Sequence, residues 1–427
     1  MELNTDVIVV GSGVGGSTAA RELAKKGKKV IILEKGELCS PKQWGSEVLA
    51  FKFYDKYGLW SRSREGVFYY RTIMAGGTSI VSCGNGVRSL EKELKSLGID
   101  LNNEFRQAEK ELGVGPVPKR LIGPGTAAIM RSAQGLGVKM VPMPKLINFK
   151  KCIGCGNCVV GCRTGAKWTA LDYLYQAQRL GATLMTGINV NRILSSRGVV
   201  TGVEGHNKLG TKVKIIAPVV ILAAGGIGTP VILLNSGIKA GRKLFLDLFT
   251  VTFGITKNLG MSQELTMAAV NHDNKGFILS PFIDTPFALA SVVPVPLRRN
   301  LKILTKRKDM LGIMVKINDD SRGSVSKDGK IGKKLTRGDL SKLKKGADIS
   351  KKILIGAGAA PETIITTKVR GAHPGGTAAI GEVVDKNLQT KIKNLYVADG
   401  SVLPKSPGLP PIVTIVALAK RLAKRIK

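Results

Sequence analysis

A glycine-rich turn within residues 6–36 constrains this sequence more than any other feature. Val7–Val10 is an unbroken apolar run of valine and isoleucine, typical of a parallel strand that is buried on both faces. A turn with the spacing G-x-G-x-x-G follows it, made by Gly11, Gly13 and Gly16. A predicted helix begins at this turn, so the stretch has the order strand, turn, helix. That order is the framework in which such a turn holds a dinucleotide.

Each glycine of this turn has a separate role. Gly11 allows the tight turn, Gly13 lets a pyrophosphate approach the backbone, and Gly16 lets helix and strand pack closely. The N–H groups at the start of the helix point at that anion. Glu34 ends a second predicted strand, Val30–Leu33, about 20 residues after the glycines, where a carboxylate can accept hydrogen bonds from a ribose. The alternative is a glycine-rich turn without a ligand. The pattern predicts a dinucleotide site and leaves FAD and NAD undecided.

The length and hydropathy of the chain set its broad class. A chain of 427 residues is long enough for two domains with a large core. No stretch approaches 18 uninterrupted apolar residues, so we expect no membrane-spanning helix. The N-terminus enters a strand almost at once, which indicates no secretory signal. We therefore expect a cytoplasmic protein.

The chain is strongly basic, with 66 Lys and Arg against 30 Asp and Glu and a formal net charge of +36. The basic residues are spread widely, and the densest stretch, 298–352, shows no nucleic-acid module and no interleaved aromatics, so no nucleic-acid partner is expected. One interpretation is a lysine-rich solvated surface. A second is a docking surface for an acidic electron carrier such as ferredoxin. A third is peripheral contact with an anionic membrane, because the C-terminal ALAKRLAKRIK has the pattern of a basic amphipathic helix.

The hydrophobic pattern divides the chain into three parts. After Glu34 we predict further elements of a doubly wound α/β domain: a helix at Trp168–Leu180 and strands at Thr183–Val190, Val199–Glu204 and Lys212–Ala223. Residues 240–365 change character and contain a helix near Gly338–Ala357. The chain then returns to a strand at Asn394–Val397 and a final helix from about Pro411. A nucleotide domain that opens and closes the chain is discontinuous, with a second domain inserted between its parts.

Further segments, in order along the chain, carry a family resemblance. These are the turn around Gly11, the loop Gly76-Gly77-Thr78-Ser79 with Asn85 and Arg88 beyond it, the run Ala223–Pro230 with Leu233–Ile238, the segment His373–Thr377, and the segment Asn394–Ser401 with Pro404 and Ser406–Gly408. Together they resemble the glucose–methanol–choline (GMC) family of FAD oxidoreductases. Lys239 stands where a glycine is usual in the family, and the resemblance is weakest over residues 240–365, the family's substrate domain.

The resemblance implies a fold, a cofactor and a set of contacts. The implied fold class is α/β, with a doubly wound FAD-binding domain formed by residues 1–240 and 366–427 and an inserted α+β substrate domain at 241–365. FAD also explains the second glycine loop and the C-terminal return, because a buried flavin ring needs both to be positioned. The final helix would point its N-terminus at the flavin ring and favour negative charge there. The candidate cofactor-binding residues are Gly11, Ser12, Gly13, Gly16, Glu34, Lys35, Gly76, Gly77, Ser79, Asn85, Val190, Ala224, Gly225, Asp399 and Gly400.

One histidine occupies the position that the family uses for proton transfer. By resemblance, His373 takes the proton of a substrate hydroxyl while hydride leaves for flavin N5, and a pKa near neutrality suits that task. The alternative is a structural histidine in a turn. The other two, His206 and His272, fall outside any matching motif. A second His or Asn is usual before a proline in the closing segment, but this chain has Pro410 there, and proline can neither titrate nor donate.

A cysteine cluster lies at residues 150–165. Its spacing, C-x2-C-x2-C-x3-C, is that of a bacterial ferredoxin [4Fe–4S] site, with candidate ligands Cys152, Cys155, Cys158 and Cys162. Arg163 replaces the usual proline, and the fourth ligand could instead be Cys83. Zinc and no metal at all are the alternatives. Some members of the family carry a similar segment that ends in Gly-x-Lys, as residues 165–167 do here.

Three functional hypotheses follow. The first is an FAD-dependent dehydrogenase of a CH–OH group in a small-molecule alcohol or lipid-like substrate, with electrons leaving through an iron–sulfur centre. The second keeps the fold and reduces a C=C bond or an isoprenoid-like lipid, a reading that the missing second catalytic residue at Pro410 favours. The third, from a different class, is a non-catalytic nucleotide- or RNA-binding protein.

Overall fold

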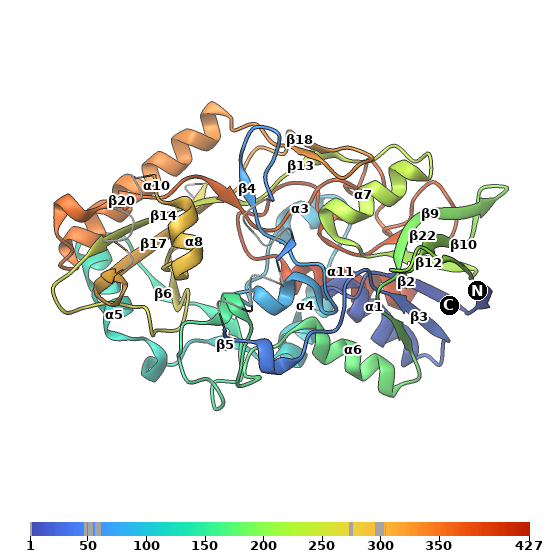
Figure 1. Cartoon of the computed structure of the whole chain (residues 1–427), viewed down its shortest axis with the longest axis horizontal. Helices are drawn as coiled ribbons and strands as arrows, with labels where there is room; N and C mark the ends of the chain where they lie inside the picture. The colour runs from blue at the N-terminus through green and yellow to red at the C-terminus, as the bar shows by residue number, and fades with distance from the viewer. Residues whose placement is uncertain are drawn as a thin grey trace.

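The computed structural model describes residues 2–46, 49, 54–55, 61–272, 276–294, 303 and 305–427. Two regions lie side by side along the long axis of the molecule (Figure 1). We call them the parallel-sheet region, built around strands β2, β3, β8, β12 and β22, and the six-stranded region, built around β4, β14, β16, β17, β20 and β21. Both chain ends lie in the parallel-sheet region.

The parallel-sheet region is built on a five-stranded sheet whose order is β22-β12-β2-β3-β8, with every neighbouring pair parallel. Its strands are β2 (Val7–Val10), β3 (Val30–Leu33), β8 (Thr183–Met185), β12 (Val219–Leu222) and β22 (Leu395–Val397). All residues of β2 and β3 are buried, as their unbroken apolar runs predict. Strand β22 comes from the end of the chain and pairs with β12, which confirms that residues far apart in sequence build this sheet.

Helices and a second sheet cover this sheet. Helix α1 packs against α6 and α11, and α11 packs against α4. Strand β10 of a four-stranded sheet, ordered β1-β11-β10-β9, packs against β12, and helix α7 packs against β9. In Figure 1 the helices α1 and α6 and the strands β9 and β10 lie on opposite sides of the parallel strands. The elements are α1 (Val14–Ala24), α4 (Asn102–Leu112), α6 (Ala170–Arg179), α7 (Gly225–Asn235), α11 (Ile412–Arg425), β1 (Glu2–Asn4), β9 (Asn189–Ser196), β10 (Val199–His206) and β11 (Lys212–Ile216).

Most predicted elements are confirmed, but two predicted strands are wrong in one respect. The stretches 183–190 and 212–223 each divide between two sheets, the first into β8 and β9 and the second into β11 and β12. Gly187, with φ of +68°, turns the chain between β8 and β9. The second division is visible in burial, since β11 alternates between exposed and buried residues whereas β12 is mostly buried. Alternating exposure indicates a strand with one face in solvent, and a continuous apolar run indicates a strand buried on both faces. The sequence prediction treated these two patterns as one strand.

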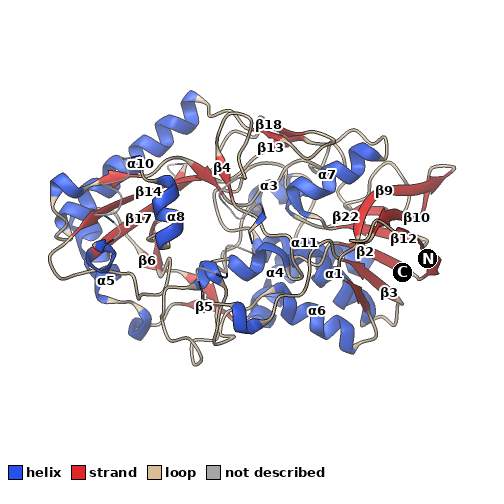
Figure 2. Cartoon of the chain, viewed as in Figure 1, coloured by secondary structure: helices blue, strands red, loops and turns tan. Residues whose placement is uncertain are grey.

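The six-stranded region contains an antiparallel core. Strand β17 lies between β16 and β14, and β14 also pairs with β20 and β21. Helix α10 packs on β14 and β17 and against α5 (Figure 2). Strand β4 joins the edge of this sheet beside β21, so three separate stretches of chain build it. The elements are α5 (Pro124–Gly135), α10 (Arg337–Gly356), β4 (Phe68–Tyr69), β14 (Leu248–Ile255), β16 (Phe277–Pro281), β17 (Met310–Ile317), β20 (Ile365–Thr366) and β21 (Arg370–Gly371).

Short elements complete the described chain. The remaining helices are α3 (Glu91–Ser96) and α8 (Pro286–Val292), with 3-10 turns η1 (Pro41–Gln43), η3 (Gly77–Val81), η4 (Lys119–Leu121), η5 (Cys158–Val160), η6 (Arg307–Asp309), η7 (Pro361–Thr363) and η8 (Gly400–Val402). There are also three small sheets. In the first, β18 (Gly323–Val325) lies between β13 (Arg242–Leu244) and β19 (Ile331–Gly332). The second pairs β6 (Val141–Pro142) with β15 (Ala269–Val270), and the third pairs β5 (Val114–Pro116) with β7 (Pro144–Leu146).

The C-terminal helix α11 is a core element. Its apolar side chains, among them Val416, Leu418 and Leu422, are buried against α1 and α4. Lys420 of the same helix is also buried and forms ion pairs with Glu22 and Glu111. The apolar face that suggested membrane contact is therefore used in packing. None of the helices in the described ranges is long and apolar enough to cross a bilayer.

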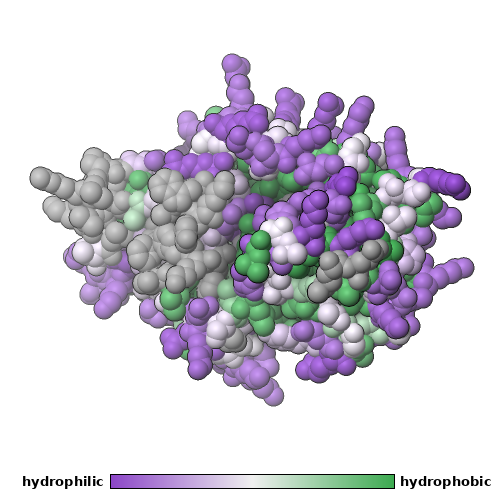
Figure 3. Space-filling view, turned by 45° about the vertical axis from the view of Figure 1, so that its right-hand side comes forward, coloured by the Kyte–Doolittle hydropathy of each residue, from purple (hydrophilic) through white to green (hydrophobic). Residues whose placement is uncertain are grey.

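The surface agrees with the plainest interpretation of the high positive charge. On the face drawn in Figure 3, hydrophilic side chains project along the top, right and lower edges of the described surface, with apolar residues scattered between them. The described part of this face is therefore hydrophilic at its edges, as a solvated surface is.

Candidate active site

A cavity of about 670 Å³ connects the two regions. One end is lined by the glycine turn of the parallel sheet, including Gly11 and Gly13, and the other by Phe249 and Met314 of the six-stranded sheet. The cavity therefore begins at the carboxyl ends of the parallel strands, where open α/β sheets bind their ligands.

The glycine turn has room for a phosphate at one position. A Cβ atom on Gly11 would lie 2.3 Å from the carbonyl oxygen of Ala223, and one on Gly16 would lie 1.9 Å from the carbonyl oxygen of Gly11. A Cβ on Gly13 would meet no described atom within 4 Å. Gly13 also precedes the first turn of α1, whose N–H groups have no partner within the helix. The residues present thus fit the diphosphate of a dinucleotide, with Gly13 as the point of closest approach.

Glu34 is held in a fixed position beside this turn. One carboxylate oxygen accepts hydrogen bonds from the backbone N–H (3.0 Å) and hydroxyl (2.7 Å) of Ser12, and the other accepts one from Gly36 N–H (2.8 Å). The Ser12 hydroxyl in turn accepts from Gly76 N–H at 3.2 Å, which joins the turn to the second glycine loop. Burial raises the pKa of Glu34, against the lowering effect of these hydrogen bonds. Glu34 lines the cavity, where its carboxylate can face a ribose.

The C-terminal return closes the opposite wall. Asp399 accepts hydrogen bonds from Gly225 N–H (2.8 Å), the Thr229 hydroxyl (2.5 Å) and Ser401 N–H (2.8 Å). Burial raises the pKa of Asp399, and these hydrogen bonds oppose the shift. A Cβ on Gly15 would lie 1.6 Å from the carbonyl oxygen of Ala398, so the return segment lies directly on α1. Sequence reasoning missed this role of Gly15.

The cavity collects most of the predicted cofactor contacts. The following candidates line it: Gly11, Gly13, Glu34, Lys35, Gly77, Ser79, Asn85, Val190, Ala224, Gly225, Asp399 and Gly400. Three candidates lie behind this lining. Ser12 holds Glu34, Gly16 packs the helix on the strand, and Gly76 makes a left-handed turn with φ of +84°. These three residues are placed to hold the lining residues in position.

His373 lies in the cavity wall next to two charged residues that the sequence reasoning did not find. Its Nδ1 is 3.0 Å from a carboxylate oxygen of Asp247 and 2.7 Å from the ammonium nitrogen of Lys316. Within the described chain, Nε2 of the ring has no hydrogen-bond partner. His373 itself has φ of +96°, rare for a residue with a side chain, so the surrounding contacts hold it in a strained conformation.

The three groups titrate as one set because they are close together and buried. Burial lowers the pKa of His373, Lys316 lowers it further, and Asp247 opposes both. Burial raises the pKa of Asp247, but Lys316 and His373 outweigh it and the net shift is downward. Burial also lowers the pKa of Lys316, with Asp247 opposing. The lowered pKa favours the neutral imidazole, in which one ring nitrogen carries the proton and the other carries a lone pair.

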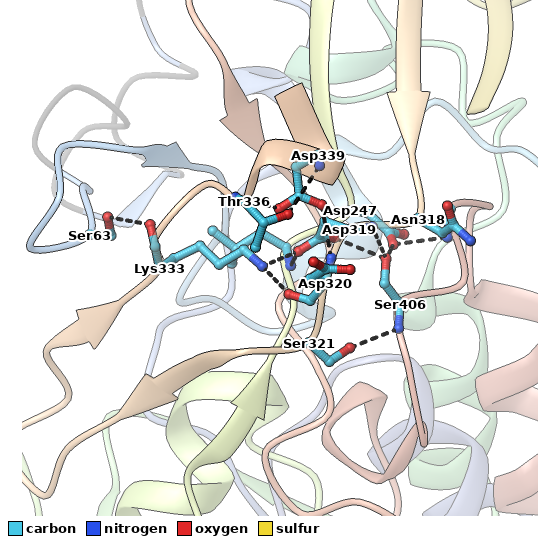
Figure 4. A network of polar contacts seen from close by, with 12 residues as sticks. Ser63, Asp247, Asn318, Asp319, Asp320, Ser321, Lys333, Thr336, Asp339 and Ser406 are labelled. Atoms are coloured by element: carbon cyan, nitrogen blue, oxygen red, sulfur yellow. Dashed lines mark hydrogen bonds and ion pairs between the residues drawn. The ribbon is translucent and has the colours of Figure 1, made fainter. Parts of the chain in front are cut away.

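A polar network behind Asp247 holds this set in place. The second carboxylate oxygen of Asp247 accepts from the Ser406 hydroxyl (2.6 Å) and Gly408 N–H (3.0 Å). Ser406 also contacts Asp319, whose carboxylate pairs with the buried Lys333. Figure 4 shows Ser406 between the two aspartates, with Lys333 on the far side of Asp319. Two buried lysines thus balance two buried aspartates.

The end of the cavity near His373 is mainly apolar. It is lined by the side chains of Phe249, Phe282, Met267 and Met314, with Pro410 at the position where the family resemblance leads one to expect a second catalytic residue. Pro410 confirms that no side chain at that position can titrate or donate. This end favours an apolar ligand portion next to the polar set around His373.

The predicted metal site in the cysteine segment is not supported by the described residues. Gly154, Gly156 and Gly161 do adopt positive φ, as a chain wrapping around a cluster requires. Yet the described residues contain no group of three or more His, Cys, Asp or Glu side chains arranged to hold a metal ion. The candidate ligands Cys152, Cys155, Cys158 and Cys162 all have free thiols.

Two buried lysines hold the second glycine loop, and one of them also holds the cysteine segment. The ammonium group of Lys167 donates to the carbonyl oxygens of Ile80 (2.8 Å), Ser82 (2.6 Å) and Cys158 (2.7 Å), and so ties the cysteine segment to the second glycine loop. Lys145 donates to the carbonyl oxygens of Cys83 and Thr266 and to the side chain of Asn85. The segment therefore supports the loop that lines the cavity.

A cavity that joins a dinucleotide turn to a histidine with charged neighbours has the arrangement of a dinucleotide-dependent oxidoreductase. Two family models, both described as GMC oxidoreductase, match residues 8–263 and 295–419. The chain therefore belongs to the GMC oxidoreductase family and is an FAD-dependent oxidoreductase, as the sequence resemblance implied.

Individual relatives agree with this assignment. An uncharacterised protein of Methanocaldococcus jannaschii is 30% identical over 424 residues, covering 99% of each chain. A long-chain-alcohol oxidase of Arabidopsis thaliana is 26% identical over 507 residues, covering 99% of this chain and 67% of that protein. Pyridoxine 4-oxidase from Mesorbium loti has the same fold, with a TM-score of 0.76, 18% identity and 99% coverage of both chains.

Proposed function

We propose that this protein oxidises the CH–OH group of an alcohol with an apolar portion, and that His373 accepts the hydroxyl proton. The position of His373 carries the proposal, since its Nδ1 is held by Asp247 and Lys316 while its Nε2 has no partner within the described chain. The apolar lining around Phe249 and Met314 supports an apolar substrate portion. The similarity to a long-chain-alcohol oxidase supports the same substrate class.

Each group of residues has a separate role in such a reaction. When bound, FAD supplies the hydride acceptor. Gly13 and the start of α1 hold the diphosphate, and Glu34 holds a ribose. Asp247 fixes the orientation of the His373 ring, and the ring takes the hydroxyl proton. The apolar wall excludes water from the reacting carbon.

The decisive experiment is anaerobic reduction of the flavin by a panel of alcohols of increasing chain length, in wild type and H373N. We expect H373N to slow flavin reduction by about 10²- to 10⁴-fold, the range for loss of a general base. H206N is the matched control, because His206 lies on β10, contacts Asn189 and Asn191, and does not itself line the cavity. An H373N protein that binds FAD and reacts at the wild-type rate would overturn the role of His373.

The same assay separates the proposal from reduction of a C=C bond. A flavin that no alcohol reduces, but that an unsaturated isoprenoid-like lipid reoxidises, would favour the reductase. The proposed reaction includes no step through the cysteines, because they form no metal-ligand set in the described chain. Iron and sulfide analysis of anaerobically purified protein tests the cluster that their spacing predicts.

A further inference from the structure

We propose that Lys316 is a positioning residue that selects which ring nitrogen of His373 carries the proton, and that it takes up the proton released by the substrate. The inference rests on the proposed function and assigns the second role that Pro410 cannot fill. Lys316 stands in β17, in the six-stranded region, within a strand whose residues are all buried.

The geometry around Nδ1 presents a choice. An imidazole nitrogen is either a donor or an acceptor, yet Nδ1 has an acceptor, Asp247, at 3.0 Å and an ammonium donor, Lys316, at 2.7 Å. When Lys316 is protonated, it donates to Nδ1 and the ring proton is on Nε2. When Lys316 is neutral, Nδ1–H donates to Asp247 and Nε2 has a free lone pair. Only the second form can accept a proton from a hydroxyl at Nε2.

The surroundings of Lys316 allow both forms. Its side chain is buried, 3.3 Å from the Asp247 carboxylate, which stabilises the ammonium ion. The other titratable groups that face it are His373, Cys83 and Asp319, and Asp319 is already paired with Lys333. Burial lowers the pKa of Lys316 from its usual value and Asp247 opposes this, so the neutral amine is reached below the pH that an exposed lysine requires.

The substrate, His373 and Lys316 together account for every proton that moves in the reaction. In the oxidation direction the substrate O–H bond breaks and its proton adds to Nε2, while the Nδ1 proton passes to the neutral amine of Lys316. The resulting ammonium ion is paired with Asp247, and the two electrons of the C–H bond leave with the hydride. In the reverse direction, protonated Lys316 holds the ring as Nε2–H, ready to protonate a carbonyl oxygen.

The first test reads the histidine tautomer directly and needs no substrate. The chain has three histidines, so long-range ¹H–¹⁵N NMR of FAD-bound protein labelled with ¹⁵N-histidine can resolve His373. At pH 7 we expect the Nε2–H form in wild type and the Nδ1–H form in K316M. K420M is the matched control, because Lys420 is also buried and ion-paired but lies on α11. The same tautomer in wild type and K316M would overturn the proposal, whether or not the protein oxidises alcohols.

The second test compares the rates of flavin reduction in K316R and K316M. If Lys316 served only to fill space and keep a charge, K316R would be the faster of the two, whereas the proposal predicts that K316M is faster. Arginine keeps a permanent charge, so K316R should lock the ring as Nε2–H and slow flavin reduction by about 100-fold or more at every pH. K316M should react faster than K316R at pH 7, and the acid limb of its rate–pH profile should move to lower pH by one unit or more. If K316R keeps more activity than K316M, or the limb does not move, the proposal fails. K420M should keep the wild-type profile.

Discussion

The two ends of the cavity are built in different ways. At the glycine turn the site consists of backbone, and each glycine is defined by how near another main-chain atom lies, as with Gly11 against Ala223 and Gly15 against Ala398. Around His373 the site consists of side chains from distant strands and loops, with charges from Asp247 and Lys316. The glycine turn can be recognised within one short stretch of sequence, whereas the charged site is made by residues that no local pattern connects.

This difference explains what the sequence could predict. The turn, Glu34 and the return at Asp399 are short local patterns, and the structure brings them to one cavity. Asp247 and Lys316 precede His373 by 126 and 57 residues, and no spacing rule connects them. One signal was available, since a single lysine inside the apolar strand MLGIMVKI indicates a buried charge that needs a partner. The cysteine spacing is the opposite case, because a pattern typical of a metal site forms no group of metal ligands in the described chain, where the buried Lys167 donates to the carbonyl oxygen of Cys158.

The largest expected effect on stability comes from removing a buried charge at the end of the cavity around His373. K333M leaves the carboxylate of Asp319 buried and without its cation, and it should cost about 3–5 kcal/mol of unfolding free energy. Urea unfolding of the FAD-bound protein measures this. The double variant K333M/D319L should recover most of the loss, since it removes both charges. Equal stability of K333M and wild type would show that the pair does not behave as a buried charge pair.

A pair of glycine variants tests the end of the cavity at the glycine turn. In G15A the new Cβ meets the carbonyl of Ala398, so we expect a loss of about 1–3 kcal/mol from overpacking. In G13A the new methyl projects into open space, so the apoprotein should unfold within about 0.5 kcal/mol of wild type. FAD affinity should nevertheless fall by about tenfold or more in G13A, because the methyl occupies the position of the diphosphate. Cofactor titration and thermal melts of the apoproteins separate the two effects, and unchanged FAD affinity in G13A would contradict the assignment.

The smallest expected effect on stability concerns Glu111, which lies outside both ends of the cavity. Burial raises the pKa of Glu111, but hydrogen bonds from Lys420, Tyr173 and Arg21 outweigh it and bring the pKa to about 2. A carboxylate with a lowered pKa stabilises the fold above its ordinary value near 4.5 and loses this contribution as the pH falls toward 2. Because the Glu111 side chain is 30% exposed, we expect about 1 kcal/mol at most. Urea unfolding between pH 5 and pH 3 should show a shallower pH dependence for E111Q, and identical slopes would contradict this.

The late position of β22 and α11 in the sequence has a consequence for biosynthesis. Strand β22 completes one edge of the parallel sheet, Asp399 holds the first turn of α7, and α11 packs on α1. These residues emerge from the ribosome after every other part of the nucleotide site. A nascent chain that ends before residue 395 therefore has the glycine turn but lacks the wall that encloses its ligand. We therefore expect a chain truncated before residue 395 to retain no FAD, which cofactor analysis of the purified fragment would check.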